Sequence, residues 1–81
     1  AHGAVGKIIK VALPTIIVQD DDNTEKVVLV SSSTKIEQAG IEATTSDLKI
    51  DNFIVVIGSP NAKGVIEAKF IRLIPNPELL Q

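Results

Sequence analysis

The segment FIVVIGSPNAKG, from Phe53 to Gly64, carries the residue types of a phosphate-binding loop: an apolar stretch that leads into two glycines and a lysine. A P-loop also needs a Ser or Thr directly after the Lys, at the start of a helix whose N-terminus faces the phosphates. Here Gly64 follows Lys63, and the next residues, VIEAKFI, have the composition of a strand. Pro60 and Asn61 suit a tight turn, and Gly64 allows a positive φ. The segment therefore predicts a β-hairpin rather than a nucleotide site.

Three consecutive acids, Asp20, Asp21 and Asp22, stand beside Asn23 and offer oxygen ligands of the kind that calcium prefers. An EF-hand loop places its ligands at alternate positions, with a Gly and a closing Glu at fixed spacings that this segment lacks. Asp and Asn instead suit hairpin loops, because they bond to their own backbone and tolerate left-handed geometry. The segment predicts a solvated hairpin tip, or at most a loose cation site of low affinity.

The remaining candidates for catalysis are hydroxyl groups and one histidine. Ser31, Ser32 and Ser33 form a hydroxyl cluster without a nearby base or an oxyanion motif, so we interpret them as strand-end and turn residues. His2 lies at a terminus that we expect to be frayed, and no acid, base and nucleophile can be assembled around it. We therefore predict no catalytic residues, no metal ligands and no cofactor, and expect that the protein is not an enzyme.

The composition limits the classes of partner. The chain has 81 residues, a formal net charge of -2, no Cys, Trp or Tyr and two Phe, and its basic residues are spread along the sequence. Binding of single-stranded nucleic acid uses a basic groove and aromatic platforms, so no nucleic-acid partner is expected. No apolar run reaches the roughly 20 residues of a membrane-spanning helix. The length fits one small domain, residues 1–81, which we interpret as excised from a larger chain because the sequence begins without Met.

The sequence predicts strands, because Ile and Val dominate the apolar residues and no long amphipathic helix fits. Any functional residue must therefore be positioned by strands and their loops. Five strands are predicted, over residues 6–13, 15–19, 25–31, 52–58 and 65–74. Pro14 separates the first two, and a single helical turn can form around Asp47 and Leu48. In the last strand the alternation of apolar and polar residues slips near Lys69 or Phe70, which predicts a β-bulge.

Five strands with a long interruption after the third predict an all-β fold. We expect a small five-stranded barrel of the oligonucleotide/oligosaccharide-binding type, an OB-like barrel, with at most one short helical turn. An SH3-like roll is the alternative, because the number of strands alone does not separate the two.

The segments GAVGKIIK, TIIV, KVVLVSSSTKI, SDLKIDNFIVVIG and GVIEAKFIRL together resemble an uncharacterised bacterial family of OB-like domains. The matching positions are Gly3, Val5, Ile16, Val18, Thr34, Asp47, Leu48, Gly58, Ala68 and Ile71. The chain departs from the family pattern at Asp51 and Asn52, where a Gly-Asp pair is usual. The resemblance implies an OB-like fold and an extracytoplasmic setting, as a module of a secreted or membrane-anchored bacterial protein. It implies no catalytic residues.

Some aliphatic residues must face outward, because a barrel this small encloses only one side of each strand. The residues predicted to be buried are Val5, Ile17, Val28, Leu48, Val55, Ile57, Ile66, Ala68 and Ile71. We expect Ile54 and Val56 on an outer surface that contacts protein, either a second copy of the chain, in a homo-oligomer, or a neighbouring domain of the parent protein. Alternatively, residues 32–49 cover this surface, with Ile36 and Ile41 as a lid.

The leading hypothesis is a non-enzymatic structural or protein-interaction module of a larger bacterial extracytoplasmic protein. The alternative is an OB-type binder of single-stranded nucleic acid or saccharide, which by analogy would use the outer surface of the second and third strands, with Lys26 at its edge. An aliphatic patch on the folded surface favours the first hypothesis, whereas a basic, aromatic groove favours the second.

Overall fold

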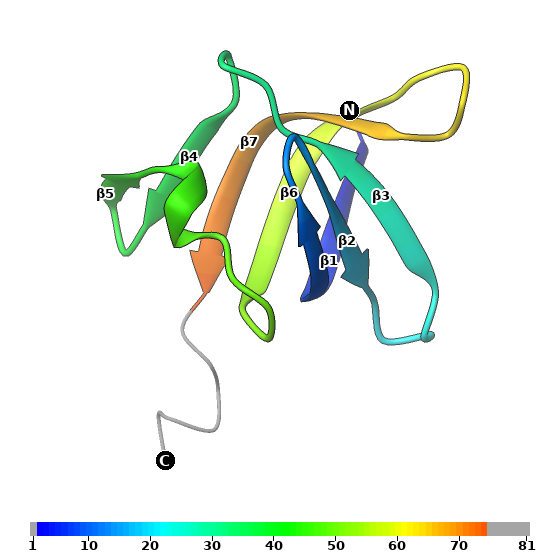
Figure 1. Cartoon of the computed structure of the whole chain (residues 1–81), viewed down its shortest axis with the longest axis horizontal. Helices are drawn as coiled ribbons and strands as arrows, with labels where there is room; N and C mark the ends of the chain where they lie inside the picture. The colour runs from blue at the N-terminus through cyan, green and yellow to red at the C-terminus, as the bar shows by residue number, and fades with distance from the viewer. Residues whose placement is uncertain (1, 75–81) are drawn as a thin grey trace.

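The computed structural model describes residues 2–74, and the regular structure in this range is almost entirely β-strand. The elements in chain order are β1 (His2–Ala12), β2 (Thr15–Gln19), β3 (Glu25–Leu29), β4 (Lys35–Gln38), β5 (Ile41–Ala43), the 3-10 turn η1 (Thr45–Asp47), β6 (Phe53–Pro60) and β7 (Ile66–Ile74). The short turn η1 confirms the helical turn expected around Asp47. Figure 1 shows the strands in their order along the chain.

Five of these strands close into a barrel. β1, β2 and β3 form an antiparallel meander, β6 pairs with the free side of β1, and β7 pairs with β6. The ring closes where β3 and β7 run parallel, with Val28 opposite Ile66 and Leu29 opposite Glu67. This order, β1–β2–β3–β7–β6, confirms the predicted all-β, OB-like barrel (Figure 1).

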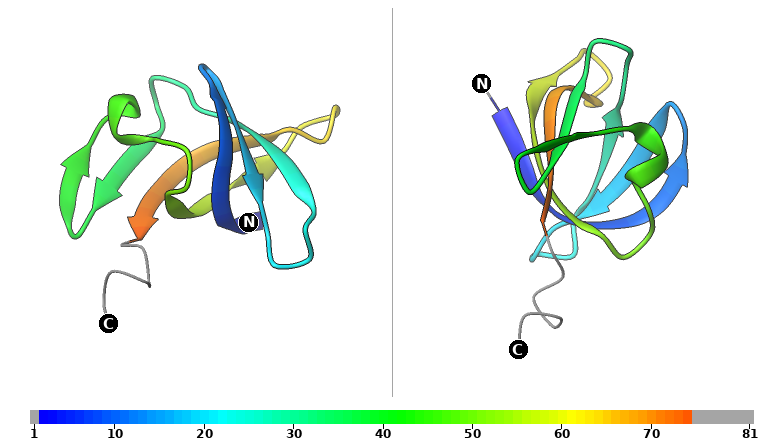
Figure 2. Two further views of the ribbon diagram at one scale, coloured as in Figure 1. Left: turned by 60° about the horizontal axis from the view of Figure 1, so that its bottom comes forward. Right: turned by 90° about the vertical axis from the view of Figure 1, so that its left-hand side faces the viewer.

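The segment after β3 adds two strands outside the ring. β4 pairs in parallel with the second half of β7, from Lys35 opposite Phe70 to Gln38 opposite Leu73, and β5 pairs with β4. The left view in Figure 2 shows this β4–β5 hairpin projecting from the barrel. The sequence did not indicate these strands, because they are short and their two-residue turn uses Ala39 at a positive φ of 53° where Asn, Asp or Gly is usual.

A β-bulge bends β7 around the barrel. Ile57 lies opposite Phe70 and Gly58 lies opposite Ala68, so Lys69 is the extra residue and the predicted bulge is confirmed. β3 leaves β7 at this point, and the Thr34 hydroxyl donates a hydrogen bond of 2.7 Å to the Ala68 carbonyl oxygen. Ala68 lies between the stretch of β7 that pairs with β3 and the stretch that pairs with β4. The Thr34 hydroxyl thus supplies a hydrogen bond to β7 where neither strand pairs with it.

The barrel interior is aliphatic. Its buried residues are Ala4, Ile8, Ile16, Val18, Val28, Val30, Ile36, Leu48, Ile54, Val56, Ile66, Ala68, Ile71 and Leu73. The prediction of burial is confirmed for Val28, Leu48, Ile66, Ala68 and Ile71. It is wrong for Val5 and Ile57, which are exposed, and Ile17 and Val55 are only half-buried; the sequence neighbours of all four are buried instead.

Two glycines lie on the inward-facing sides of β1 and β6. A Cβ atom on Gly6 would lie 2.2 Å from the carbonyl oxygen of Gln19, and a Cβ on Gly58 would lie 2.2 Å from that of Glu67. Neighbouring backbone therefore approaches the buried side of each strand at a position that only Gly permits. Because side chains alternate with a period of two, the odd-numbered residues face outward in β6 and in β1 as far as Lys7. A register shift between Ile8 and Lys10 then interrupts the alternation in β1.

Candidate protein-interaction face

The residues predicted to contact a partner are inside the barrel. Ile54 and Val56 are each 0% exposed, so the prediction that they face outward is wrong. β6 is apolar on both sides, and its own pattern therefore could not distinguish the two faces. The lid alternative is also wrong for Ile41, which is 72% exposed, whereas Ile36 is buried in the core.

The outward-facing residues of β1, β6 and β7 form a surface that we call the outer apolar face. They lie in three rows across the strands: Gly3, Ile57 and Phe70; Val5, Val55 and Arg72; and Lys7, Phe53 and Ile74. Val5 and Ile57 are 58% and 44% exposed, and the other apolar side chains of these rows are half-buried. The aliphatic patch expected on β6 therefore exists, but on the opposite side of the strand.

Both aromatic residues of the chain, Phe53 and Phe70, belong to the outer apolar face rather than to the core. Aromatic side chains contribute large contact areas and are enriched in the centres of protein interfaces. One signal in the sequence could have located this surface. Lys7 has the same parity as Val5 in β1, so an outward Lys7 requires an outward Val5.

Basic side chains border the apolar residues. The guanidinium carbon of Arg72 lies 5.7 Å from the centre of the Phe70 ring, and its Nη2 lies 3.4 Å from Glu37 Oε1. Lys35 lies opposite Phe70 on the β4 side. The ion pair is partly exposed and adds little to stability, but it holds the guanidinium over the ring.

A shallow, open hollow of about 390 Å³ lies next to this face, at the end of β7. It is lined by Glu37, Ala39, Gly40, Arg72, Leu73 and Ile74. Small-molecule sites are usually enclosed and bury most of their ligand. The geometry here suits contact with a broad surface better than capture of a small molecule.

The loop after β6 is a hairpin turn, as predicted. The Asn61 side-chain oxygen accepts hydrogen bonds from the backbone N–H groups of Lys63 at 2.8 Å and Val65 at 3.1 Å. Gly64 has a positive φ of 80°. The amide groups that a phosphate would need are partly used within the turn, and β7 rather than a helix follows.

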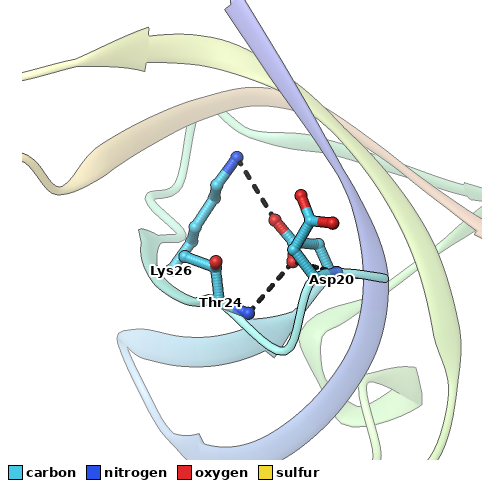
Figure 3. Close-up of polar contacts among 4 residues, drawn as sticks. Asp20, Thr24 and Lys26 are labelled. Carbon is cyan, nitrogen blue, oxygen red and sulfur yellow. Dashed lines mark hydrogen bonds and ion pairs between the residues drawn. The ribbon is translucent and has the colours of Figure 1, made fainter.

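The acidic loop between β2 and β3 is also a hairpin tip, which confirms that prediction. Asp20 Oδ1 accepts hydrogen bonds from the N–H groups of Asp22 and Thr24, and Asp20 Oδ2 lies 3.8 Å from Lys26 Nζ (Figure 3). Lys26, expected at the edge of an OB-type binding surface, is thus paired with this loop. Within residues 2–74, no group of three or more His, Cys, Asp or Glu side chains lies close enough together to hold a metal ion.

The serine cluster forms a turn after β3, as predicted. The Ser31 and Ser33 hydroxyls lie 2.8 Å apart, and the Ser31 N–H donates to the Thr34 hydroxyl at 3.0 Å. The expectation of a frayed terminus at His2 is wrong for the backbone, because β1 begins at His2, opposite Gly58 of β6. The serines follow β3, whereas His2 begins β1.

The outer surface of β2 and β3, where the OB-type analogy places a ligand, is different in character. Ile17 lies opposite Val27 there, and Val27 is 37% exposed. Neither Phe lies on these strands. The β2–β3 surface thus carries aliphatic residues without an aromatic side chain, whereas both Phe side chains lie on the outer apolar face.

No family model, curated protein or solved structure matches the chain in comparisons with known proteins. Among residues 2–74, no helix has the length and apolar character needed to cross a membrane.

Proposed function

We propose that this chain is a non-enzymatic protein-interaction module that docks onto another protein domain through the outer apolar face. The observation that carries the proposal is the position of both Phe side chains outside an entirely aliphatic core, beside exposed Val5 and Ile57. The largest contiguous apolar patch on a small protein is often functional, and contact with another protein is one such function.

The size of the face favours a neighbouring domain over a second copy as the partner. Three strands and three rows of residues cover about 14 Å by 20 Å, or roughly 300 Å². A stable interface buries about 800 Å² on each partner. A domain of the same parent protein can dock on a smaller surface, because the connection between the domains raises their effective concentration. The small area of the face therefore supports docking within a larger protein.

The proposed setting is extracytoplasmic, in a secreted or membrane-anchored bacterial protein. It is supported by the resemblance of segments such as KVVLVSSSTKI and GVIEAKFIRL to an uncharacterised bacterial family of OB-like domains. An OB-like barrel alone supports no particular ligand, since this fold serves many functions.

One observation favours the alternative, a binder of single-stranded nucleic acid. Phe70 lies next to Arg72 and Lys35, and bases stack on aromatic rings beside cations. Most apolar residues of the face are nevertheless aliphatic, and Glu37 already pairs with Arg72. We therefore propose a protein partner.

The proposal is tested with a photoreactive amino acid placed at position 57 and, as a matched control, at position 27. Ile57 and Val27 are both strand residues, 44% and 37% exposed, on different sides of the barrel. In the full-length parent protein, position 57 should form a defined cross-link to another domain, while position 27 should form none. Equal cross-linking from both positions, or none from position 57, would contradict the proposal.

A further inference from the structure

β5 has an open edge. In the part of the chain that the structure describes, every other strand has neighbours on both sides, whereas β5 pairs only with β4. Figure 1 places β5 at the far left, beyond β4 and away from the barrel. Unpaired strand edges present backbone N–H and C=O groups that can accept another strand.

The hairpin geometry determines which backbone groups face this edge. The turn contains two residues, so Gln38 and Ile41 are the hydrogen-bonded pair that closes it. The next pair in an antiparallel ladder, Glu37 and Glu42, is then a pair without mutual hydrogen bonds. The N–H and C=O of Glu42 consequently point away from β4, toward the open side.

The charges along the row that ends at Glu42 are unbalanced. Arg72 lies opposite Glu37, and Glu37 lies opposite Glu42. Arg72 forms an ion pair with Glu37, so the row reads positive, negative, negative as far as the open edge. Like charges directly opposite each other are destabilising, and a cation in the next position of the row would offset this repulsion.

A hollow beside the edge has two carboxylates in its lining. It measures about 270 Å³ and is lined by Gln38, Ala39, Ile41, Glu42, Ala43 and Asp47. Its two carboxylates, from Glu42 and Asp47, are both exposed. Ile41 and Ala43 also line the hollow, from the opposite face of β5; Ile41 is 72% exposed and Ala43 packs against the core, so residues flanking the cation would meet apolar neighbours.

We propose that β5 accepts an extended segment of a partner protein as an additional strand, with a Lys or Arg opposite Glu42 and apolar residues on either side of it. Strand addition of this type draws affinity from the backbone and specificity from alternate side chains. A second copy of this chain is not the occupant, because antiparallel pairing centred on β5 would place Glu42 opposite Glu42. The inference concerns a different surface from the outer apolar face and stands independently of it.

The probes for the test are two blocked peptides that differ at one position, with the central sequences Val-Lys-Val and Val-Glu-Val. Each is titrated into the isotopically labelled protein while backbone amide resonances are recorded. The lysine peptide should shift the amides of residues 41–44 and slow solvent exchange of the Glu42 N–H. The glutamate peptide should bind at least about tenfold more weakly, which corresponds to about 1.4 kcal/mol.

Two variants separate the charge from the backbone contribution. Glu42→Lys should reverse the preference between the two peptides, because the row would then end at the open edge in a cation instead of an anion. Glu42→Pro removes the outward N–H without removing a bond to β4, so it should abolish binding while the remaining resonances stay dispersed. Equal binding of the two peptides to the wild-type protein would overturn the inference, as would shifts confined to the outer apolar face. No response of residues 41–44 at millimolar peptide would also overturn it.

Discussion

Asp20 and Asn61 make the same set of hydrogen bonds in two different hairpins. The side-chain oxygen of each accepts from the N–H groups two and four residues later, at 2.9 and 3.1 Å for Asp20 and at 2.8 and 3.1 Å for Asn61. The N–H of each donates to the carbonyl four residues later, Thr24 at 3.0 Å and Val65 at 2.8 Å.

The shared hydrogen bonds explain why both loops are turns, although their residue types also occur in cation-binding and phosphate-binding sites. In both loops the fourth residue has a positive φ, 62° at Asn23 and 80° at Gly64. The first side chain of each loop folds back over this turn and satisfies its backbone donors. The oxygen atoms and N–H groups that suggested cation or phosphate binding are thus committed to the loop itself.

Replacement of Asn61 by Ala should destabilise the barrel by about 1 to 2 kcal/mol, because the N–H groups of Lys63 and Val65 lose their acceptor. Asn61→Asp keeps that acceptor and should cost less. The free energy of unfolding is measured by urea denaturation. An alanine variant as stable as the wild type would show that the side chain does not hold the turn.

Replacement of single β6 side chains by Ala should distinguish the two faces of the strand. Ile54→Ala should cost about 2 to 5 kcal/mol, because this fully buried side chain would leave a cavity. Ile57→Ala, in the same strand but exposed, should cost less than about 1 kcal/mol. Urea denaturation of both variants checks the assignment, and similar losses for the two would contradict it.

Addition of a methyl group at Gly58 should be strongly destabilising. The new Cβ would lie 2.2 Å from the Glu67 carbonyl oxygen, and relief of this clash requires the β6 and β7 backbones to separate, at a cost of about 1 to 3 kcal/mol or more. Gly40→Ala is the matched comparison. It meets nothing within 4 Å and should cost only about 1 kcal/mol, from its positive φ. A Gly58→Ala variant that melts at the wild-type temperature would rule out this close approach.

The isolated chain should be monomeric over a wide concentration range, because the outer apolar face is smaller than a stable dimer requires. Light scattering measures the mass, and Ile57→Asp should leave it unchanged. Concentration-dependent dimerisation that Ile57→Asp abolishes would instead assign this face to self-association.

Single-stranded oligonucleotides should not bind with useful affinity, since the chain has a net charge of -2 and the ring of Phe70 is already covered on one side by Arg72. Fluorescence anisotropy with a labelled oligonucleotide tests this. Tight, salt-sensitive binding that Phe70→Ala removes would favour the nucleic-acid alternative.

Several features followed from the sequence because their causes are local. The β-branched composition predicted strands, Pro14 and the two loops beginning at Asp20 and Asn61 predicted turns, and the break in alternation predicted the bulge at Lys69. Each of these depends on residues close together in the chain, and the order of the strands then favoured the barrel.

The face that each strand turns inward was decided by the tertiary structure. β1 and β6 are apolar on both sides, so burial of Ile54 and exposure of Ile57 were decided only by the way these strands pair with their neighbours in the barrel. The β4–β5 hairpin likewise exists because the second half of β7 offers it a pairing edge. Long-range pairing therefore produced both candidate surfaces, the outer apolar face and the open edge at Glu42, because residues distant in the sequence become neighbours only when the barrel closes.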